Sequence, residues 1–116
     1  MIVELQLPFP PSVNRLWRTG RKRVYKSDEY TAWLEEAGWR AKEQRPGAIV
    51  GPYVIDIRAA RPDKRRRDLG NLEKAVSDLL ESIGIISDDC WAEGIHLSWA
   101  QGEGVYVRVQ DVGVEC

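Results

Sequence analysis

Residues 53–84 read YVIDIRAARPDKRRRDLGNLEKAVSDLLESIG, and they predict a strand, a basic connection and a helix in succession. The strand is indicated by apolar residues at every second position, which mark one buried face: Tyr53, Ile55, Ile57 and Ala59. The helix is indicated by an apolar stripe at helical spacing: Leu69, Leu72, Val76, Leu79, Leu80 and Ile83. Gly84 suits the C-terminal end of this helix, because glycine adopts the left-handed conformation found there.

The flanking sequence predicts one more helix and three more strands. Residues 3–7 alternate between apolar and polar side chains and stop at Pro8, as in a half-buried strand. A helix is expected from the N-cap position Ser27 to the region before Pro46, with this apolar face: Tyr30, Trp33, Leu34, Ala37 and Ala41. Strands are expected over 95–99 and 105–109, on either side of a glycine-rich turn. The sequence therefore predicts a single compact α/β domain over residues 1–116, in the order βαβαββ, with a mixed β-sheet and two main helices.

The composition is that of an ordinary globular protein. Hydrophobic residues make up 43% and charged residues 30% of the 116-residue chain. No apolar run approaches the ~20 residues of a membrane span, and no signal-peptide pattern opens the chain, so no membrane partner is expected. Cys90 and Cys116 do not form a disulfide framework and are compatible with the expected cytoplasmic location.

The basic residues are concentrated in two segments, although the formal net charge is only −1. Six of them fall in residues 15–26, which contain no acidic residue: Arg15, Arg18, Arg21, Lys22, Arg23 and Lys26. Six more fall in residues 58–67, where Asp63 alone opposes them. Local potential governs polyanion binding more than net charge, so the two clusters predict contacts to the phosphates of a polyanion, with solvated basic loops as the alternative. Beyond the N-terminal Arg15, the expected contacts are Arg18, Arg21, Lys22, Arg23, Lys64, Arg65, Arg66 and Arg67.

Carboxylates flank the second helix at both ends. Asp68 stands where that helix begins, and Asp88 and Asp89 follow it. Taken singly, Asp68 is typical of an N-cap and the Asp88–Asp89 pair of a turn. Beside a basic segment, however, the three carboxylates are candidate metal ligands, because Mg²⁺ is usually held by one or two carboxylates, waters and phosphate oxygens. Such an ion can activate water and stabilise the charge that develops on a phosphodiester.

Lys74 is the candidate cation for the same chemistry. On a helical wheel it lies away from the apolar stripe and on the same side as position 70. An ammonium there could stabilise a developing negative charge, and a solvated surface lysine is the alternative.

Several motifs of the chain are those of a known family. They are Leu7-Pro8-Phe9-Pro10-Pro11-Ser12-Val13-Asn14-Arg15, then Arg61 to Leu69, Asn71-Leu72, Lys74, and Asp88-Asp89. Over nearly its whole length the chain resembles the RusA-type Holliday junction resolvases of bacteria and their prophages. The central motif, Pro-Asp followed by basic residues and Asp-x-Asp-Asn-x-x-Lys, is long and specific.

The resemblance implies a Mg²⁺-dependent endonuclease, with Mn²⁺ as a possible substitute. Such enzymes are small homodimers that bind four-way DNA junctions and nick two strands of like polarity symmetrically, which suits a two-fold dimer. Asp68 matches the first catalytic aspartate of the family, Asp89 the catalytic aspartate after the helix, and Lys74 the functional lysine. Asn14 and Arg15 match the N-terminal motif, which the resemblance puts beside the DNA backbone.

The chain departs from the family pattern at position 70, where Gly70 replaces the second aspartate of the motif. We expect weakened or absent cleavage with junction binding retained, because binding rests on Lys and Arg contacts to phosphates. Two other outcomes stay open: Asp68 and Asp89 suffice for one ion, or Asp88 or Glu73 takes over the missing role. The alternative function is a catalytically silent junction-binding protein, and a third is a module whose basic loops bind an acidic protein.

Overall fold

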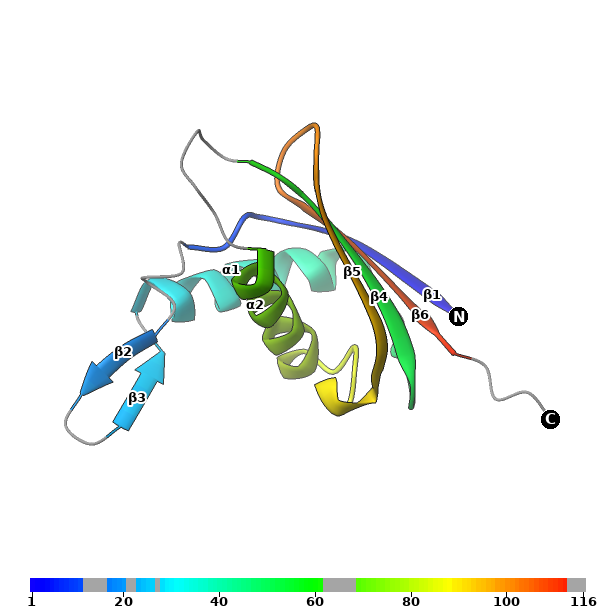
Figure 1. Ribbon diagram of the computed structural model, residues 1–116, viewed down its shortest axis with the longest axis horizontal. Coiled ribbons are helices and arrows are strands. Elements are labelled where there is room, and N and C mark those ends of the chain that lie inside the picture. The colour runs from blue at the N-terminus through cyan, green and yellow to red at the C-terminus, as the bar shows by residue number, and fades with distance from the viewer. Residues whose placement is uncertain (12–16, 21–22, 27, 62–68, 113–116) are drawn as a thin grey trace.

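The computed structural model describes residues 1–11, 17–20, 23–26, 28–61 and 69–112, and their side chains except those of 17–20, 23–26 and 69–71. The elements, shown in Figure 1, are β1 (Ile2–Leu7), β2 (Trp17–Gly20), β3 (Arg23–Lys26), α1 (Asp28–Glu43), β4 (Tyr53–Ala60), α2 (Leu69–Ser82), the 3-10 helix η2 (Asp89–Trp91), β5 (Ala92–Ala100) and β6 (Val105–Asp111). The predicted order βαβαββ is confirmed by β1, α1, β4, α2, β5 and β6.

The main sheet has the strand order β1-β6-β4-β5. Strands β1 and β4 each pair with β6 in antiparallel register, whereas β4 and β5 run parallel. Parallel neighbours need a long crossover connection, and α2 lies in that connection. The mixed sheet that the sequence predicts is therefore confirmed, with its single parallel pair placed around α2.

A second, two-stranded sheet lies in the N-terminal basic segment, where the sequence predicts a loop. Strands β2 and β3 pair antiparallel, from Trp17 opposite Lys26 to Gly20 opposite Arg23. The loop prediction is wrong for these residues. Apolar alternation is the main sequence signal for a strand, and two strands of four residues each, Trp17–Gly20 and Arg23–Lys26, are too short to show it.

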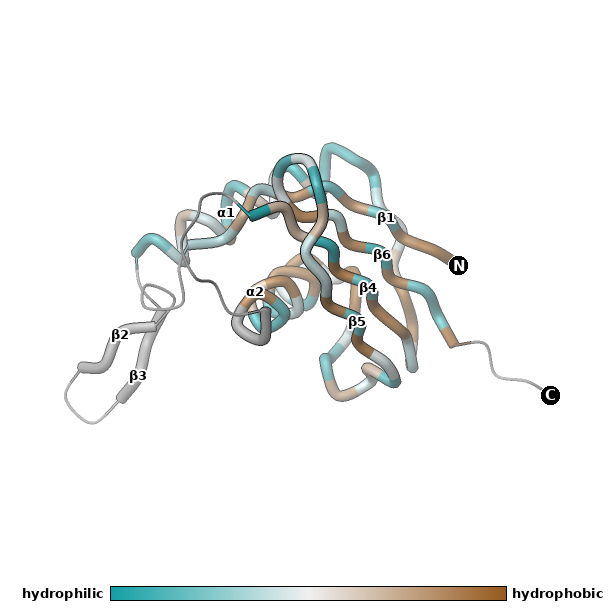
Figure 2. Tube along the Cα trace, turned by 45° about the horizontal axis from the view of Figure 1, so that its top comes forward, coloured by the Kyte–Doolittle hydropathy of each residue, from teal (hydrophilic) through white to brown (hydrophobic). Residues whose placement is uncertain are grey.

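Both helices cover the same face of the main sheet, as Figures 1 and 2 show. Alternate strand residues point into the core beneath them: Val3, Leu5 and Leu7 of β1, Tyr53, Ile55, Ile57 and Ala59 of β4, and Val105, Val107 and Val109 of β6. The predicted apolar faces of the two helices complete the core. Their buried residues are Tyr30, Trp33, Ala37 and Ala41 of α1 and Leu72, Val76, Leu79 and Leu80 of α2. On the edge strand β5, Ile95 remains 49% exposed, because no further strand covers it.

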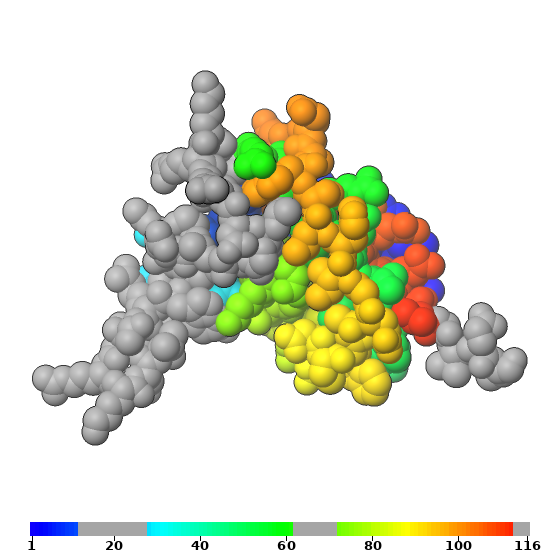
Figure 3. Space-filling view, in the orientation of Figure 1, coloured from blue at the N-terminus to red at the C-terminus, as the bar shows by residue number. Residues whose placement is uncertain are grey.

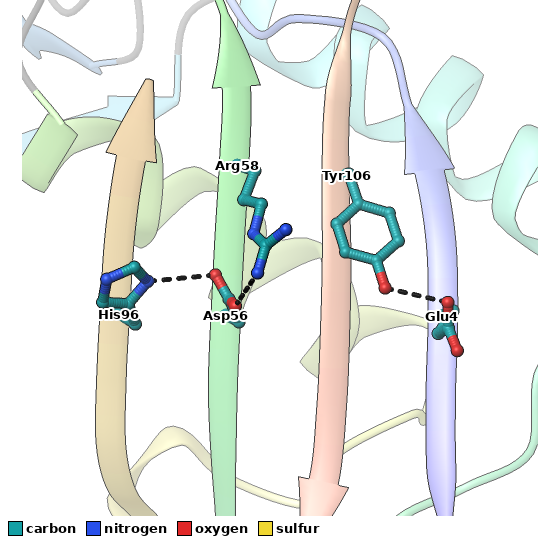
Figure 4. A network of polar contacts seen from close by, with 5 residues as sticks. All are labelled: Glu4, Asp56, Arg58, His96 and Tyr106. Carbon is teal, nitrogen blue, oxygen red and sulfur yellow. Dashed lines mark hydrogen bonds and ion pairs between the residues drawn. The ribbon is translucent and has the colours of Figure 1, made fainter. Parts of the chain in front are cut away.

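The other face of the sheet carries polar side chains (Figure 4), and neither α1 nor α2 covers it (Figure 1). Asp56 lies between two partners, with its carboxylate oxygens 3.2 Å from Nδ1 of His96 and 3.2 Å from a guanidinium nitrogen of Arg58. The hydroxyl of Tyr106 donates a hydrogen bond of 2.8 Å to Glu4. This open face explains the clean alternation of apolar and polar residues in β1 and β4.

The end of α2 directs the chain back toward the start of β4. Gly84 has a φ of +79°, as the sequence predicts, and the amide of Ile85 donates to the carbonyl of Leu80 at 2.9 Å. The Ile85 carbonyl then accepts a hydrogen bond of 2.7 Å from the amide of Ile49. These contacts hold the chain that leads into η2 against the last turn of α2.

Across the described ranges, none of the helices combines the length and the apolar character that crossing a lipid bilayer requires.

Candidate active site

Asp88 and Asp89 form the start of η2, on the surface beside α2 (Figure 3, yellow). Asp88 has an extended backbone and caps the 3-10 helix, because its Oδ1 accepts a hydrogen bond of 2.9 Å from the amide of Cys90. The turn that the sequence offered as the alternative for this pair is thus present. It holds Oδ1 of Asp88 at the N-terminus of η2.

Glu81, in the last turn of α2, joins the two aspartates. Carboxylate oxygens of Glu81, Asp88 and Asp89 all lie within 4.8 Å of one another, and all three residues are exposed. Sequence reasoning missed Glu81. The one hint in the sequence was Gly84, which predicts the end of the helix. A chain that turns back after this glycine passes the last helical turn, which contains Glu81.

The charges of this acidic cluster are closely coupled. A side-chain hydrogen bond to Asp88 raises the pKa of Asp89, and desolvation and the charge of Asp88 add to this. The backbone amide of Cys90 lowers the pKa of Asp88. Loss of hydration, followed by the charges of Asp88 and Asp89, raises the pKa of Glu81. A proton on Asp89 relieves the repulsion between these groups, and so would a cation.

Glu73 and Ser77 continue along α2 from Glu81 at intervals of four residues. Ser77 is buried, and its hydroxyl donates a hydrogen bond of 2.7 Å to Oε1 of Glu73. Glu73 thus turns toward the following helical turn, away from position 70. The charge of Glu73, like that of Asp89, raises the pKa of Tyr53.

Tyr53, the first residue of β4, pairs with Ala92, the residue that follows η2. Its side chain is buried, and its hydroxyl has no hydrogen-bond partner in the described part of the chain. Burial raises the pKa of Tyr53 to about 12, and the charge of Asp89 is the next cause. Sequence reasoning used Tyr53 only as a core residue, and its hydroxyl gave no further signal.

Several predicted site residues lie outside the described part of the chain: Asn14, Arg15, Arg21, Lys22, Lys64, Arg65, Arg66, Arg67 and Asp68. Arg18 and Arg23 belong to β2 and β3, where only the backbone is described. Gly70 lies in the first turn of α2, and Lys74 is exposed one turn further on. The described geometry thus brings Asp88 and Asp89 together with Glu81.

The length of α2 separates the two acidic ends of the helix. Asp68 is bonded to Leu69, the first residue of α2, whereas Asp89 lies beside Glu81 in the last turn. At 1.5 Å per residue, the rise from Leu69 to Glu81 is about 18 Å. Within one chain, the acidic cluster therefore lies at the other end of α2 from Leu69, the residue that follows Asp68 in the sequence.

The acidic cluster fits a hard divalent cation. The three candidate ligand atoms are carboxylate oxygens, the ligand type that Mg²⁺ and Mn²⁺ prefer. Their mutual distances of up to 4.8 Å need only small side-chain rotations to surround one ion. The buried phenol of Tyr53 adds an unused hydrogen-bond donor near them.

Comparison with known proteins gives consistent matches. Residues 8–110 match the family model described as Endodeoxyribonuclease RusA. A protein of Aquifex aeolicus (strain VF5) named crossover junction endodeoxyribonuclease RusA is 36% identical over 109 residues, which cover 90% of this chain and 86% of the relative. Proteins of the same name from Escherichia coli (strain K12) and Enterobacteria phage 82 are each 38% identical over 86 residues, covering 73% of this chain and 72% of each relative. The chain belongs to the RusA family of endodeoxyribonucleases.

Proposed function

We propose that this protein is a divalent-metal-dependent endonuclease that resolves four-way DNA junctions by symmetric nicking. The observation that carries the proposal is the acidic cluster of Glu81, Asp88 and Asp89 in a chain of this family. The names of the relatives, crossover junction endodeoxyribonucleases, support the same substrate.

Mg²⁺ is the proposed cofactor, with Mn²⁺ as a substitute. Asp89, Asp88 and Glu81 would hold it, since each has a carboxylate oxygen within 4.8 Å of those of the other two. When bound, Mg²⁺ supplies Lewis-acid stabilisation of the scissile phosphodiester and lowers the pKa of a coordinated water. The protein's own contribution is to hold Asp88 in place through the Cys90 amide and to keep the acidic groups beside the end of α2.

A homodimer is part of the proposal, and the geometry of α2 supports it. In the sequence Asp68 directly precedes Leu69, whereas Asp89 lies beside Glu81, which is about 18 Å along the helix axis from Leu69; Mg²⁺–oxygen bonds measure about 2.0–2.1 Å. A second copy, related by a two-fold axis, could bring its Asp68 to the Asp89 end of the first. Mixing Asp68→Asn protein with Asp89→Asn protein tests this, because only a shared site regains cleavage in the mixed dimer.

DNA binding is assigned to the two basic segments. Their proposed contacts are Asn14, Arg15, Arg18, Arg21, Lys22, Arg23, Lys64, Arg65, Arg66 and Arg67. Replacing Arg66 by alanine should weaken binding to every junction sequence and flatten the slope of log K against log salt by about 0.9. Lys74, exposed on α2 one turn after Gly70, is the proposed cation for the developing phosphate charge.

Cleavage of a labelled four-way junction tests the function. We would compare the unmodified chain, Gly70→Asp and Asp68→Asn, with and without Mg²⁺. Symmetric nicks from the unmodified chain support an active enzyme whose remaining carboxylates suffice. Nicks only after Gly70→Asp indicate a resolvase that is silenced at position 70. The second candidate function, a silent junction-binding protein, is favoured by Gly70 and requires that both proteins bind junctions and neither cuts.

A further inference from the structure

The proposed chemistry gives no role to the hydroxyl of Tyr53, a residue near the acidic cluster. Tyr53 is 1% exposed, and in the described part of the chain its hydroxyl oxygen has no hydrogen-bond partner. A buried donor without a partner destabilises a fold, and phenylalanine would fill the same space without this cost. The hydroxyl therefore calls for a reason other than packing.

The other tyrosines with described side chains all have partners. The hydroxyl of Tyr30 donates to Asp78 at 2.7 Å, and that of Tyr106 donates to Glu4 at 2.8 Å. In this protein a described phenol is thus normally paired with a carboxylate. Tyr53 differs because its hydroxyl has no partner among the described residues.

The register of the sheet places Tyr53 next to the candidate metal site. Tyr53 pairs with Ala92, the residue that follows η2, at the point where the β4–β5 register shifts. Its side chain belongs to the core on the same face of β4 as Ile55 and Ile57. The three residues before Ala92 are those of η2, which begins with Asp89.

The backbone points to Asp89 as the acceptor, because Asp89 begins η2, which ends just before Ala92, the residue paired with Tyr53. Glu73 already accepts from Ser77 at 2.7 Å, and Asp88 already accepts from the Cys90 amide at 2.9 Å. Among the acidic groups that raise the pKa of Tyr53, after burial itself, Asp89 has the largest effect. The side chain of Asp89 is in contact with Asp88, an arrangement that a cation between them would open.

We propose that Tyr53 is a positioning residue of the metal site, whose phenol donates a hydrogen bond to the carboxylate of Asp89 and holds that carboxylate toward a bound divalent cation. The inference rests on the proposed function, because it takes Asp89 to be a ligand. Donors of this kind fix the direction of a ligand carboxylate, and their removal typically weakens metal binding by about 10–100-fold.

The test is Tyr53→Phe in the full chain, with Mn²⁺ alone as the probe. We would titrate Mn²⁺ and follow the EPR signal of the free ion, and in parallel record thermal unfolding in EDTA. The expected result is a Mn²⁺ affinity about 10–100-fold weaker, with an unfolding temperature in EDTA that is not lowered. Loss of affinity without loss of stability is a combination that a packing role would not produce.

Two comparisons sharpen the test. Tyr106→Phe removes a phenol from the opposite face of the sheet and should leave Mn²⁺ affinity unchanged. In an Asp89→Asn background, Tyr53→Phe should cause no further loss, because the acceptor that it serves is altered.

Three results would overturn the inference. They are an unchanged Mn²⁺ affinity in Tyr53→Phe, an equal loss in the Asp89→Asn background, and a Tyr53→Phe protein that no longer unfolds cooperatively in EDTA, which would make the hydroxyl structural. Failure of the proposed function would give a different result, in which neither the unmodified chain nor Gly70→Asp binds Mn²⁺. In that case the role proposed for Tyr53 is also wrong.

Discussion

The hydroxyl of Tyr30 donates a hydrogen bond of 2.7 Å to Oδ2 of Asp78 and so joins α1 to α2. Tyr30 is fully buried, and its ring stacks on Trp33 at a centroid distance of 6.1 Å. Burial, followed by this hydrogen bond, raises the pKa of Tyr30. The contact fixes the face of α2 that also carries Glu81, because Asp78 and Glu81 are three residues apart on the helix.

Tyr30→Phe should therefore destabilise the protein. Removing a donor to a partly buried carboxylate costs about 1.5–3 kcal/mol, and urea unfolding at neutral pH measures it. The matched comparison is Tyr53→Phe, which removes a buried hydroxyl that has no partner in the described structure. Similar losses of stability in both variants would show that the Tyr30–Asp78 bond contributes nothing specific.

Metal should stabilise the protein through the acidic cluster. Without divalent ions, Asp89→Asn is expected to raise the unfolding temperature, because three carboxylates within 4.8 Å repel one another. With Mg²⁺ at about 100 times its Kd, the unmodified chain should gain about 2.7 kcal/mol. Differential scanning fluorimetry in EDTA and in Mg²⁺ measures both effects. An equal Mg²⁺-dependent gain in Asp89→Asn would exclude Asp89 as a ligand.

Acid should weaken the open face of the sheet at Asp56. Burial alone would raise the pKa of Asp56, but hydrogen bonds from His96 and Arg58 more than offset this and lower it. A lowered pKa in the folded state means that ionised Asp56 contributes stability above its unfolded pKa of about 3.9, and that this contribution is lost as the pH falls through the folded value. Urea midpoints should thus fall less steeply below about pH 4 in Asp56→Asn than in the unmodified chain.

The turn between β5 and β6 should tolerate a side chain at Gly102 better than at Gly104. Both have positive φ, +113° and +73°. A Cβ on Gly104 would lie 2.5 Å from the carbonyl oxygen of Leu7, whereas nothing lies within 4 Å of one on Gly102. Backbone strain of about 1–3 kcal/mol is expected for either alanine variant, and Gly104→Ala should lose more because β1 must also move. Equal unfolding free energies would contradict this steric argument.

The order of elements was predictable because the apolar residues of each buried helix or strand recur at regular spacing. Alternation marked β1, β4 and β6, and a stripe at helical spacing marked α1 and α2. Gly84 and Gly104 marked ends and turns, and both have the positive φ that only glycine adopts easily. The strands β2 and β3 were not predicted because their residues do not alternate between apolar and polar side chains.

The candidate site was predictable in part. Asp88 and Asp89 stood out as a pair in the sequence, and the structure shows that they lie together. Glu81 and Tyr53 could not be singled out in the same way. An acidic residue on an exposed helix and a tyrosine in a strand are both common, and only the return of the chain after Gly84 and the β4–β5 register bring them to η2.

The strand order has a consequence for synthesis on the ribosome. β1 is made first, yet its only neighbour in the main sheet is β6, which also separates it from β4. The first strand must wait for residues 105–111 before it can pair. At about 5–20 residues per second, the nascent chain keeps an unpaired apolar strand for several seconds. Completion of this sheet is thus a step that follows emergence of β6, and a ribosome stalled before residue 105 would hold a chain whose sheet cannot close.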